Sequence, residues 1–224
     1  MRCIHETTDC CSQKKIQLDW QTVLSTYKLY RSLHFIKRHG PILSGIYLKA
    51  VYGGEGYVPV FHTHSLMTPF PVVSLTAPVA LTNSKGAEDS IRFVRHTNEL
   101  NTIISNFRIQ CPAAFTQPLT CTIVEQLYNS TIANAIDYPV QTMTDAVLLS
   151  LWCNKKEQAE AQIQSYRSII ASWPAAAQKR CGGADRWEAD IRSQWNREQI
   201  TNTIQTELTR FKLDHLQDML LACE

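Results

Sequence analysis

After Gly183 the chain continues to Glu224 without a single Gly or Pro. These two residues interrupt helices most strongly, so such a stretch can run as helix. Asp185-Arg186-Trp187-Glu188 has the spacing of a capping box, in which a side chain satisfies a free amide of the first helical turn. We therefore predict one long C-terminal helical segment over residues 184–222. Its apolar stripe comprises Trp187, Ile191, Trp195, Ile200, Ile204, Leu208, Phe211 and Leu216.

A second stretch without Gly or Pro runs from Gln17 to His39. Its apolar residues also recur at helical spacing, and Gly40-Pro41 would end a helix. We therefore predict one helix over this stretch. Its outer face would carry Lys28, Arg31, Lys37, Arg38 and His39.

Residues 42–82 have a different character, with short apolar runs rich in Ile, Val and Tyr. They predict a small antiparallel β insert, in which Gly53-Gly54-Glu55-Gly56 forms a hairpin turn. Helical spacing returns at Glu88, a short apolar helix is predicted over residues 142–152, and Asn154-Lys155-Lys156-Glu157 is another capping box. We expect an α+β fold that is predominantly helical, in one compact unit over residues 1–224. Only residues 1–13 suggest disorder.

The positive charge is concentrated near the start of the chain. Lys and Arg exceed Asp and Glu by five in residues 1–50, whereas residues 51–153 have a net charge of −3 and residues 154–224 are neutral. A basic block is compatible with a phosphate-binding face, and equally with a solvated surface.

The eight cysteines form no Cys-x-x-Cys pair, and their spacings match no zinc site. Residues 1–20 lack the apolar core of a secretory signal, so we expect reduced thiols in a cytoplasmic protein, with Cys153 buried. No apolar run is long enough to span a membrane.

A search for catalytic motifs finds no nucleophile elbow, phosphate-binding loop or zinc-protease motif. His62-Thr63-His64 would place two imidazoles on one face of a strand, which could begin a metal site with Cys3, His5, Cys10 and Cys11. A strand histidine pair without a metal is the simpler interpretation. We therefore expect neither an enzyme nor a bound cofactor.

The best candidate for anion binding is the predicted helix start at Asn154, Lys155 and Lys156. A helix N-terminus offers free amides and the positive end of a dipole, and two ammonium groups would add salt-sensitive contacts to DNA phosphates. The alternative is that Asn154 only caps the helix while both lysines face water.

Three short elements resemble the Tus family of replication-terminator proteins, with the same spacing between them. They are His96-Thr97-Asn98-Glu99-Leu100, Asn134-Ala135 and Trp152-Cys153-Asn154-Lys155, with Leu127, Ala146 and Leu148 at matching positions. The resemblance implies binding of duplex DNA at a terminator-like site, contacts from Asn154 and Lys155, and a replicative helicase as a further partner.

The departures from the family narrow this implication. The positions that would hold a flipped base are Thr120, Val124, Asn129 and Ser130, and none preserves the stacking and hydrogen bonding required. The chain is also nearly neutral. We therefore expect DNA binding without the family's lock on a replication fork. The expected contact residues are Asn154, Lys155 and Lys156, together with Lys28, Arg31, Lys37 and Arg38 of the basic N-terminal block.

A second hypothesis is a helical adaptor, which would dock a protein partner through the long C-terminal stripe. An ordinary buried core would explain the same stripe. No membrane partner is expected.

Overall fold

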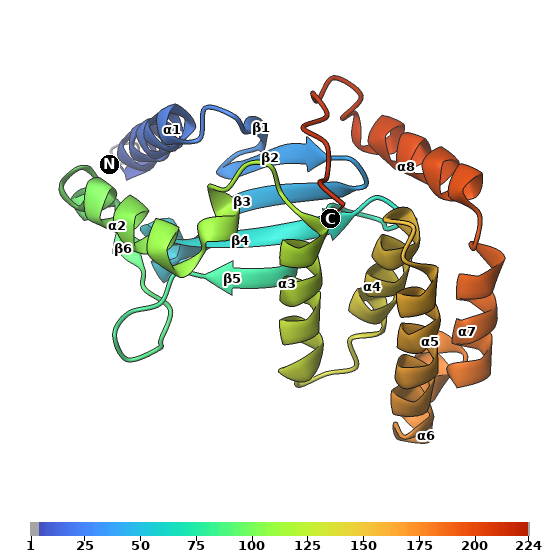
Figure 1. The fold of residues 1–224 in the computed structure, drawn as a ribbon. Helices are drawn as coiled ribbons and strands as arrows, with labels where there is room; N and C mark the ends of the chain where they lie inside the picture. Colours follow the sequence, from blue (N-terminus) through green and yellow to red (C-terminus); the bar gives the residue numbers. More distant parts are fainter. Residues whose placement is uncertain (1–4, 224) are drawn as a thin grey trace.

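The computed structural model describes the backbone of residues 5–223 and the side chains of residues 13–223. Helices account for 52% of the residues and strands for 20%, which confirms a predominantly helical α+β fold. The strands form one antiparallel sheet in the order β1-β2-β3-β4-β5, with β6 paired to β4 (Figure 1). Their bounds are β1 Lys28–Arg31, β2 His34–His39, β3 Ile42–Val51, β4 Gly56–Ser65, β5 Thr76–Ala80 and β6 Ile91–Arg92.

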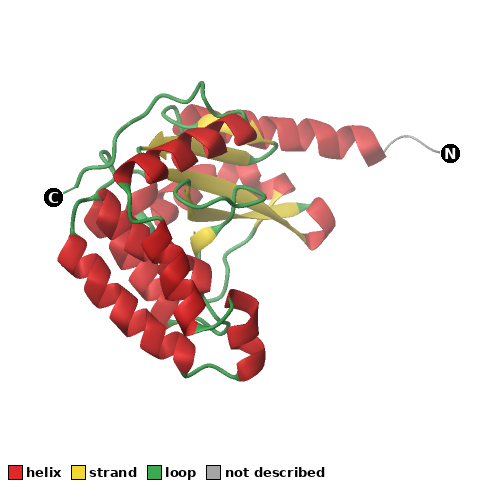
Figure 2. Cartoon of the chain, turned by 90° about the vertical axis from the view of Figure 1, so that its right-hand side faces the viewer, coloured by secondary structure: helices red, strands yellow, loops and turns green. Residues whose placement is uncertain are grey.

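The described helices lie around this sheet. In Figure 1, α1 and α2 lie at one end of the strands, and α3 to α8 lie at the other. Figure 2 shows α1 projecting beyond the rest of the protein. The bounds are α1 His5–Val23, α2 His96–Gln110, α3 Cys121–Ala133, α4 Val140–Trp152, α5 Lys156–Ala171, α6 Ala175–Cys181, α7 Ala184–Ser193 and α8 Arg197–Phe211.

The predicted helix over residues 17–39 is wrong beyond Val23, because β1 and β2 form a hairpin there. The adjacent side chains Phe35 and Ile36 are both fully buried, one in each of two hydrophobic clusters. Neighbouring residues point to opposite sides of a strand, so a two-sided sheet can bury both. The sheet therefore begins at Lys28, well before the predicted insert at residue 42. The predicted glycine turn between β3 and β4 is confirmed.

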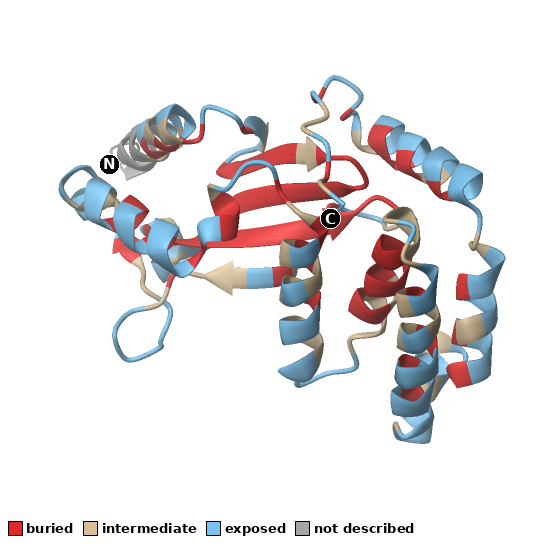
Figure 3. Cartoon of the chain, viewed as in Figure 1, coloured by how far each residue is buried: buried red, intermediate tan, exposed pale blue. Residues whose placement is uncertain are grey.

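The protein has two hydrophobic clusters, one at each end of the strands: Leu48 farther along β3 belongs to one, and Leu43 near the start of the same strand belongs to the other. One joins the sheet to α1 and α2 through Trp20, Phe61 and Phe107. The other joins it to the C-terminal helices through residues such as Leu43 and Trp187. Figure 3 shows that β2, β3 and β4 are mostly buried and that α4 exposes little of its surface. Burial on both faces makes the sheet a rigid platform for the surrounding segments.

The predicted C-terminal helix is two helices, α7 and α8, followed by a loop from Lys212 onward. The Asn196 side chain accepts the amide of Glu198 at 2.9 Å and so begins α8 as a separate helix. Asp185 is not a cap either, because α7 begins at Ala184 after Gly183. Most of the predicted stripe is nevertheless buried in the protein's own core: Trp187, Ile191, Ile200, Ile204, Leu208 and Leu216.

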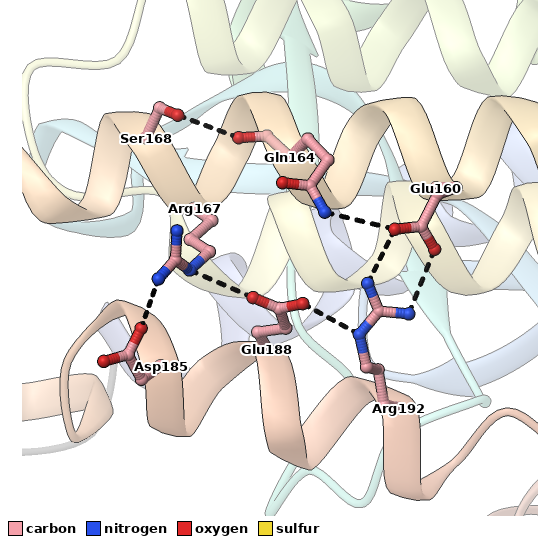
Figure 4. Close-up of polar contacts among 7 residues, drawn as sticks. All are labelled: Glu160, Gln164, Arg167, Ser168, Asp185, Glu188 and Arg192. Carbon is pink, nitrogen blue, oxygen red and sulfur yellow. Dashed lines mark hydrogen bonds and ion pairs between the residues drawn. The ribbon is translucent and has the colours of Figure 1, made fainter.

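An ion-pair network links α5 to α7 on the surface (Figure 4). Glu188 lies between two arginines, 3.0 Å from Arg167 and 2.8 Å from Arg192. Arg167 also pairs with Asp185 at 2.7 Å, and Arg192 with Glu160 at 2.6 Å. The network adds polar contacts between two helices that also pack through the core.

The chain after α8 returns to the sheet and lies beside the end of β2. The Met219 amide donates to the Arg38 carbonyl at 3.0 Å, and the Ala222 amide donates to the Leu119 carbonyl at 3.1 Å. We call residues 212–223 the C-terminal segment. Its position makes it a structural neighbour of the first strands.

A disulfide between Cys153 and Cys223 further attaches this segment to the end of α4. It contradicts the expectation that all cysteines are reduced, and Cys153 is only half-buried. Folding brings together two cysteines that are 70 positions apart in sequence, which spacing motifs cannot reveal. Cys111, Cys121 and Cys181 are free thiols, while the side chains of Cys3, Cys10 and Cys11 lie outside the described residues.

Candidate nucleic-acid interface

A groove runs between β1 and the end of α8, with a volume of about 490 Å³. We call it the basic groove, because four of its twelve lining residues are Lys or Arg. Residues 28–31 form one wall and residues 210–216 form the other. The lining residues are Lys28, Leu29, Tyr30, Arg31, Ile36, Pro71, Arg210, Phe211, Lys212, Leu213, His215 and Leu216.

The cations on both walls are exposed because of the elements that carry them, an edge strand on one wall and a helix end on the other. β1 is the edge strand of the sheet, and its Lys28 and Arg31 side chains are exposed. On the other wall, Lys212 ends α8 in a left-handed conformation with φ of 59°. The buried side chains of Leu213 and Leu216 anchor the turn that follows, so that Lys212 and His215 remain exposed.

The charge of the groove is almost unopposed. Over residues 13–223, no Asp or Glu lines the groove. Among the described side chains, Lys28, Arg31 and Lys212 have no ion-pair partner, whereas Arg210 pairs with the buried Glu207. The nearby Asp214 carboxylate accepts a hydrogen bond from Thr209 at 2.8 Å, which draws it toward α8. Clustered cations of this kind produce a positive potential that attracts anions.

Two of the four predicted N-terminal cations therefore meet at one site, and two do not. The Lys37 side chain is buried, with its ammonium 4.5 Å from the centre of the Tyr27 ring, and burial lowers its pKa to about 8. Arg38 pairs with Asp218 at 3.3 Å. The four cations do not share a face, because they lie on two strands of a hairpin and not on one helix.

The predicted anion site at Asn154 lies outside the basic groove and differs from expectation. Asn154 adopts a φ of 61° and does not cap α5, whose first residue is Lys156, so the capping box is wrong. The Lys155 ammonium lies 3.4 Å from the Glu125 carboxylate. Lys156 is exposed and lines a separate cavity of about 350 Å³ with Trp195 and Arg197. Only Lys156 thus retains an exposed charge at this position.

The sequence pattern does not reveal Arg210, Lys212 and His215 as groove residues. It places Arg210-Phe211-Lys212 in the middle of a long helix, where these residues would point in different directions. The helix actually ends at Phe211. A helix end at this point would have been the signal, but no Gly or Pro marks it.

The histidines of the predicted metal site are buried and bonded to other residues. His62 Nε2 lies 2.8 Å from His34 Nε2, and His64 Nδ1 lies 2.8 Å from the Ser74 hydroxyl. Burial lowers the pKa of His62 to about 3 and that of His64 to about 4. Among the described side chains, no group of three or more His, Cys, Asp or Glu is placed to hold a metal ion. The other candidate ligands, Cys3, His5, Cys10 and Cys11, have side chains outside that part of the chain.

No family model, curated protein or solved structure matches this chain. The resemblance to terminator proteins therefore stays a prediction. In the structure its first residue, His96, is buried and bonded to Tyr57 at 2.8 Å and to Asp19 at 3.0 Å. This histidine connects α2 to the sheet and to α1. In the described part of the chain, no helix combines the length and apolar character needed to cross a membrane.

Proposed function

We propose that the protein binds duplex DNA through the sugar-phosphate backbone, with the basic groove as its contact surface. The supporting observation is that Lys28, Arg31, Arg210 and Lys212 meet in a groove whose lining, over the part of the chain that the structure describes, has no carboxylate. Lysine and arginine supply most of the affinity for DNA by displacing condensed counterions from phosphates. The exposed Lys156 would extend the contact only if the DNA also reaches α5.

The experiment is a titration of labelled duplex with the full chain, followed by fluorescence anisotropy at several salt concentrations. Three phosphate contacts, from the unpaired Lys28, Arg31 and Lys212, correspond to a slope of about −2.7 in log affinity against log salt, since each contributes about −0.9. The triple variant Lys28→Ala/Arg31→Ala/Lys212→Ala should bring that slope close to zero and weaken binding at low salt.

A matched control removes cations elsewhere on the surface. Lys179 and Arg180 lie on α6 and have no ion pair among the described side chains. The variant Lys179→Ala/Arg180→Ala changes the net charge by two without touching the groove. An equal loss of affinity for the duplex in the control and in the double variant Lys28→Ala/Arg31→Ala would contradict the proposal. An absence of duplex binding at low salt would contradict it as well.

The proposal keeps a cytoplasmic location, although the Cys153–Cys223 disulfide removes the reduced-thiol argument for it, and assigns the protein no enzymatic activity. It includes neither fork arrest nor a helicase partner, because the positions for base capture are not preserved. The adaptor hypothesis has less support from its motivating feature, because six of the eight residues of the C-terminal stripe are buried in the protein's own core.

A further inference from the structure

The lining of the basic groove is divided between charged and apolar surfaces. Its cations are exposed, and so are the apolar side chains of Leu29 and Pro71. Phosphate contacts alone require no apolar surface. Sites for small organic ligands combine polar groups with apolar surface, at volumes of about 300–1,000 Å³. The groove, at about 490 Å³, has the size and lining of such a site.

Each wall of the groove carries an aromatic ring associated with an arginine. The Arg31 guanidinium lies 5.0 Å from the centre of the Tyr30 ring, and the Arg210 guanidinium lies 4.5 Å from that of Phe211. Aromatic rings and guanidinium planes are the surfaces on which unpaired nucleic-acid bases stack. A duplex whose bases are all paired offers no base face to them.

Buried imidazoles support both rings. His34 packs edge-to-face against Tyr30, with 5.4 Å between ring centres, and His64 packs in the same way against Phe211 at 5.5 Å. Both imidazoles are themselves buried: His34 is bonded to His62 of β4, and His64 to Ser74 in the loop before β5. The stacking surfaces are therefore held in place before a ligand arrives, which lowers the entropic cost of binding.

We infer that the basic groove binds a single nucleoside phosphate, with its base against Phe211 and its phosphate at Lys28, Arg31 and Lys212. This inference rests on the proposed function for its phosphate contacts. The nucleotide can come from two sources, a free nucleotide or the terminal nucleotide of a DNA strand.

The test measures binding of four probes to the full chain by calorimetry: AMP, inorganic phosphate, a 5′-phosphorylated single strand, and a circular duplex without ends. AMP should bind at least about 10-fold more tightly than inorganic phosphate, because only AMP carries a base that can stack. Tighter binding of the phosphorylated strand than of AMP identifies a strand end as the source, and the reverse order identifies a free nucleotide.

The variant Phe211→Leu tests the role of the base directly. It should weaken AMP binding about 10-fold, as expected for loss of a base-stacking ring, and leave phosphate binding unchanged. Phe115→Leu is the matched control, because the Phe115 ring also lies under a guanidinium, that of Arg108 at 4.9 Å, outside the groove. Melting curves of both variants verify that they are folded.

Two results would overturn the inference: AMP binding no tighter than phosphate, or AMP binding that is unchanged in Phe211→Leu. The circular duplex separates this failure from failure of the proposed function. If that duplex binds with a steep salt dependence while AMP does not bind, duplex binding stands and the nucleotide site is rejected. If AMP binds and the duplex does not, the nucleotide site stands and duplex binding is rejected.

Discussion

The carboxylate of Asp218 attaches the C-terminal segment to the end of β2, where it lies 3.3 Å from the Arg38 guanidinium. The same carboxylate accepts the Gly40 amide at 2.7 Å and the Leu220 amide at 2.8 Å. One side chain thus holds the turn between β2 and β3 against the segment that supplies a wall of the basic groove. This explains why Arg38 contributes to structure and not to the groove.

Replacement of Asp218 by Ala should destabilise the protein by about 1–3 kcal/mol, because two backbone amides lose a charged acceptor. Urea denaturation measures this change. Asp190→Ala is the control: Asp190 forms an exposed pair with Arg186, and such pairs contribute about 0–1 kcal/mol. An unchanged urea midpoint in Asp218→Ala would show that the segment is held by other contacts.

The stability of the protein should depend on the ionisation of Asp145. This side chain is buried, and burial raises its pKa to about 7 from an ordinary value of 3.8. The folded protein therefore retains a proton that the unfolded chain releases. The contribution of this group to stability is largest below about pH 4 and decreases as the pH rises to 7, by up to about 1.4 kcal/mol per pH unit.

Asp145→Asn removes this dependence while keeping an oxygen that can accept from Gln141, 3.0 Å away. The variant should gain stability relative to the parent protein as the pH rises from about 5 to about 7. Urea denaturation at intervals of one pH unit across this range gives the difference in free energy of unfolding between the two proteins. Both contain the same buried histidines, so the contribution of these histidines is absent from the difference. A difference that stays constant over this range would show that Asp145 is ionised throughout.

Gly45 and His62 should be energetically coupled. They face each other in β3 and β4, and a Cβ added at Gly45 would lie 2.6 Å from the His62 Cε1 atom. We expect Gly45→Ala to destabilise by about 1–3 kcal/mol, as other small-to-large changes in packed cores do. In the double variant Gly45→Ala/His62→Ala the added methyl group has room. Thermal unfolding of both single variants and the double variant measures the coupling, and strict additivity would contradict it.

The ion-pair network of Figure 4 should stabilise the α5–α7 pair in a salt-dependent way. Glu188→Gln removes the carboxylate shared by Arg167 and Arg192 and should lower the melting temperature in dilute buffer. In about 1 M salt the Debye length is about 3 Å, so the difference from the parent protein should largely disappear. Glu198→Gln, at the start of α8 and outside the network, serves as the comparison. A decrease in Glu188→Gln that persists at high salt would point to lost packing.

Local pattern sufficed for α4, a helix that is apolar on most sides. The prediction at residues 142–152 agrees with α4 to within two residues, and eight of its side chains are buried. It failed at residues 24–39, where the spacing of apolar residues fits a helix as well as a hairpin. Pairing decides between them: β2 aligns with β3 over its full length, from His34 opposite Tyr47 to His39 opposite Ile42. That contact is not visible in the segment's own periodicity.

The basic groove was only half predictable for a related reason. Lys28 and Arg31 could be identified as exposed cations, although on the wrong element. Lys212 could not, because its role depends on where α8 ends and on the return of the chain to the sheet. Local pattern also failed for Lys155, whose charge is paired with Glu125 from another helix.

The two walls of the basic groove come from residues 28–31 and 210–216, which are brought together only in the folded state. A ligand that bridges them has no binding surface in the unfolded chain or in a fragment that lacks either wall. Occupancy of the groove must therefore oppose unfolding, by an amount that grows with the logarithm of ligand concentration. A thermal melt becomes a way to rank anions by affinity without attaching a label to the protein or to the ligand.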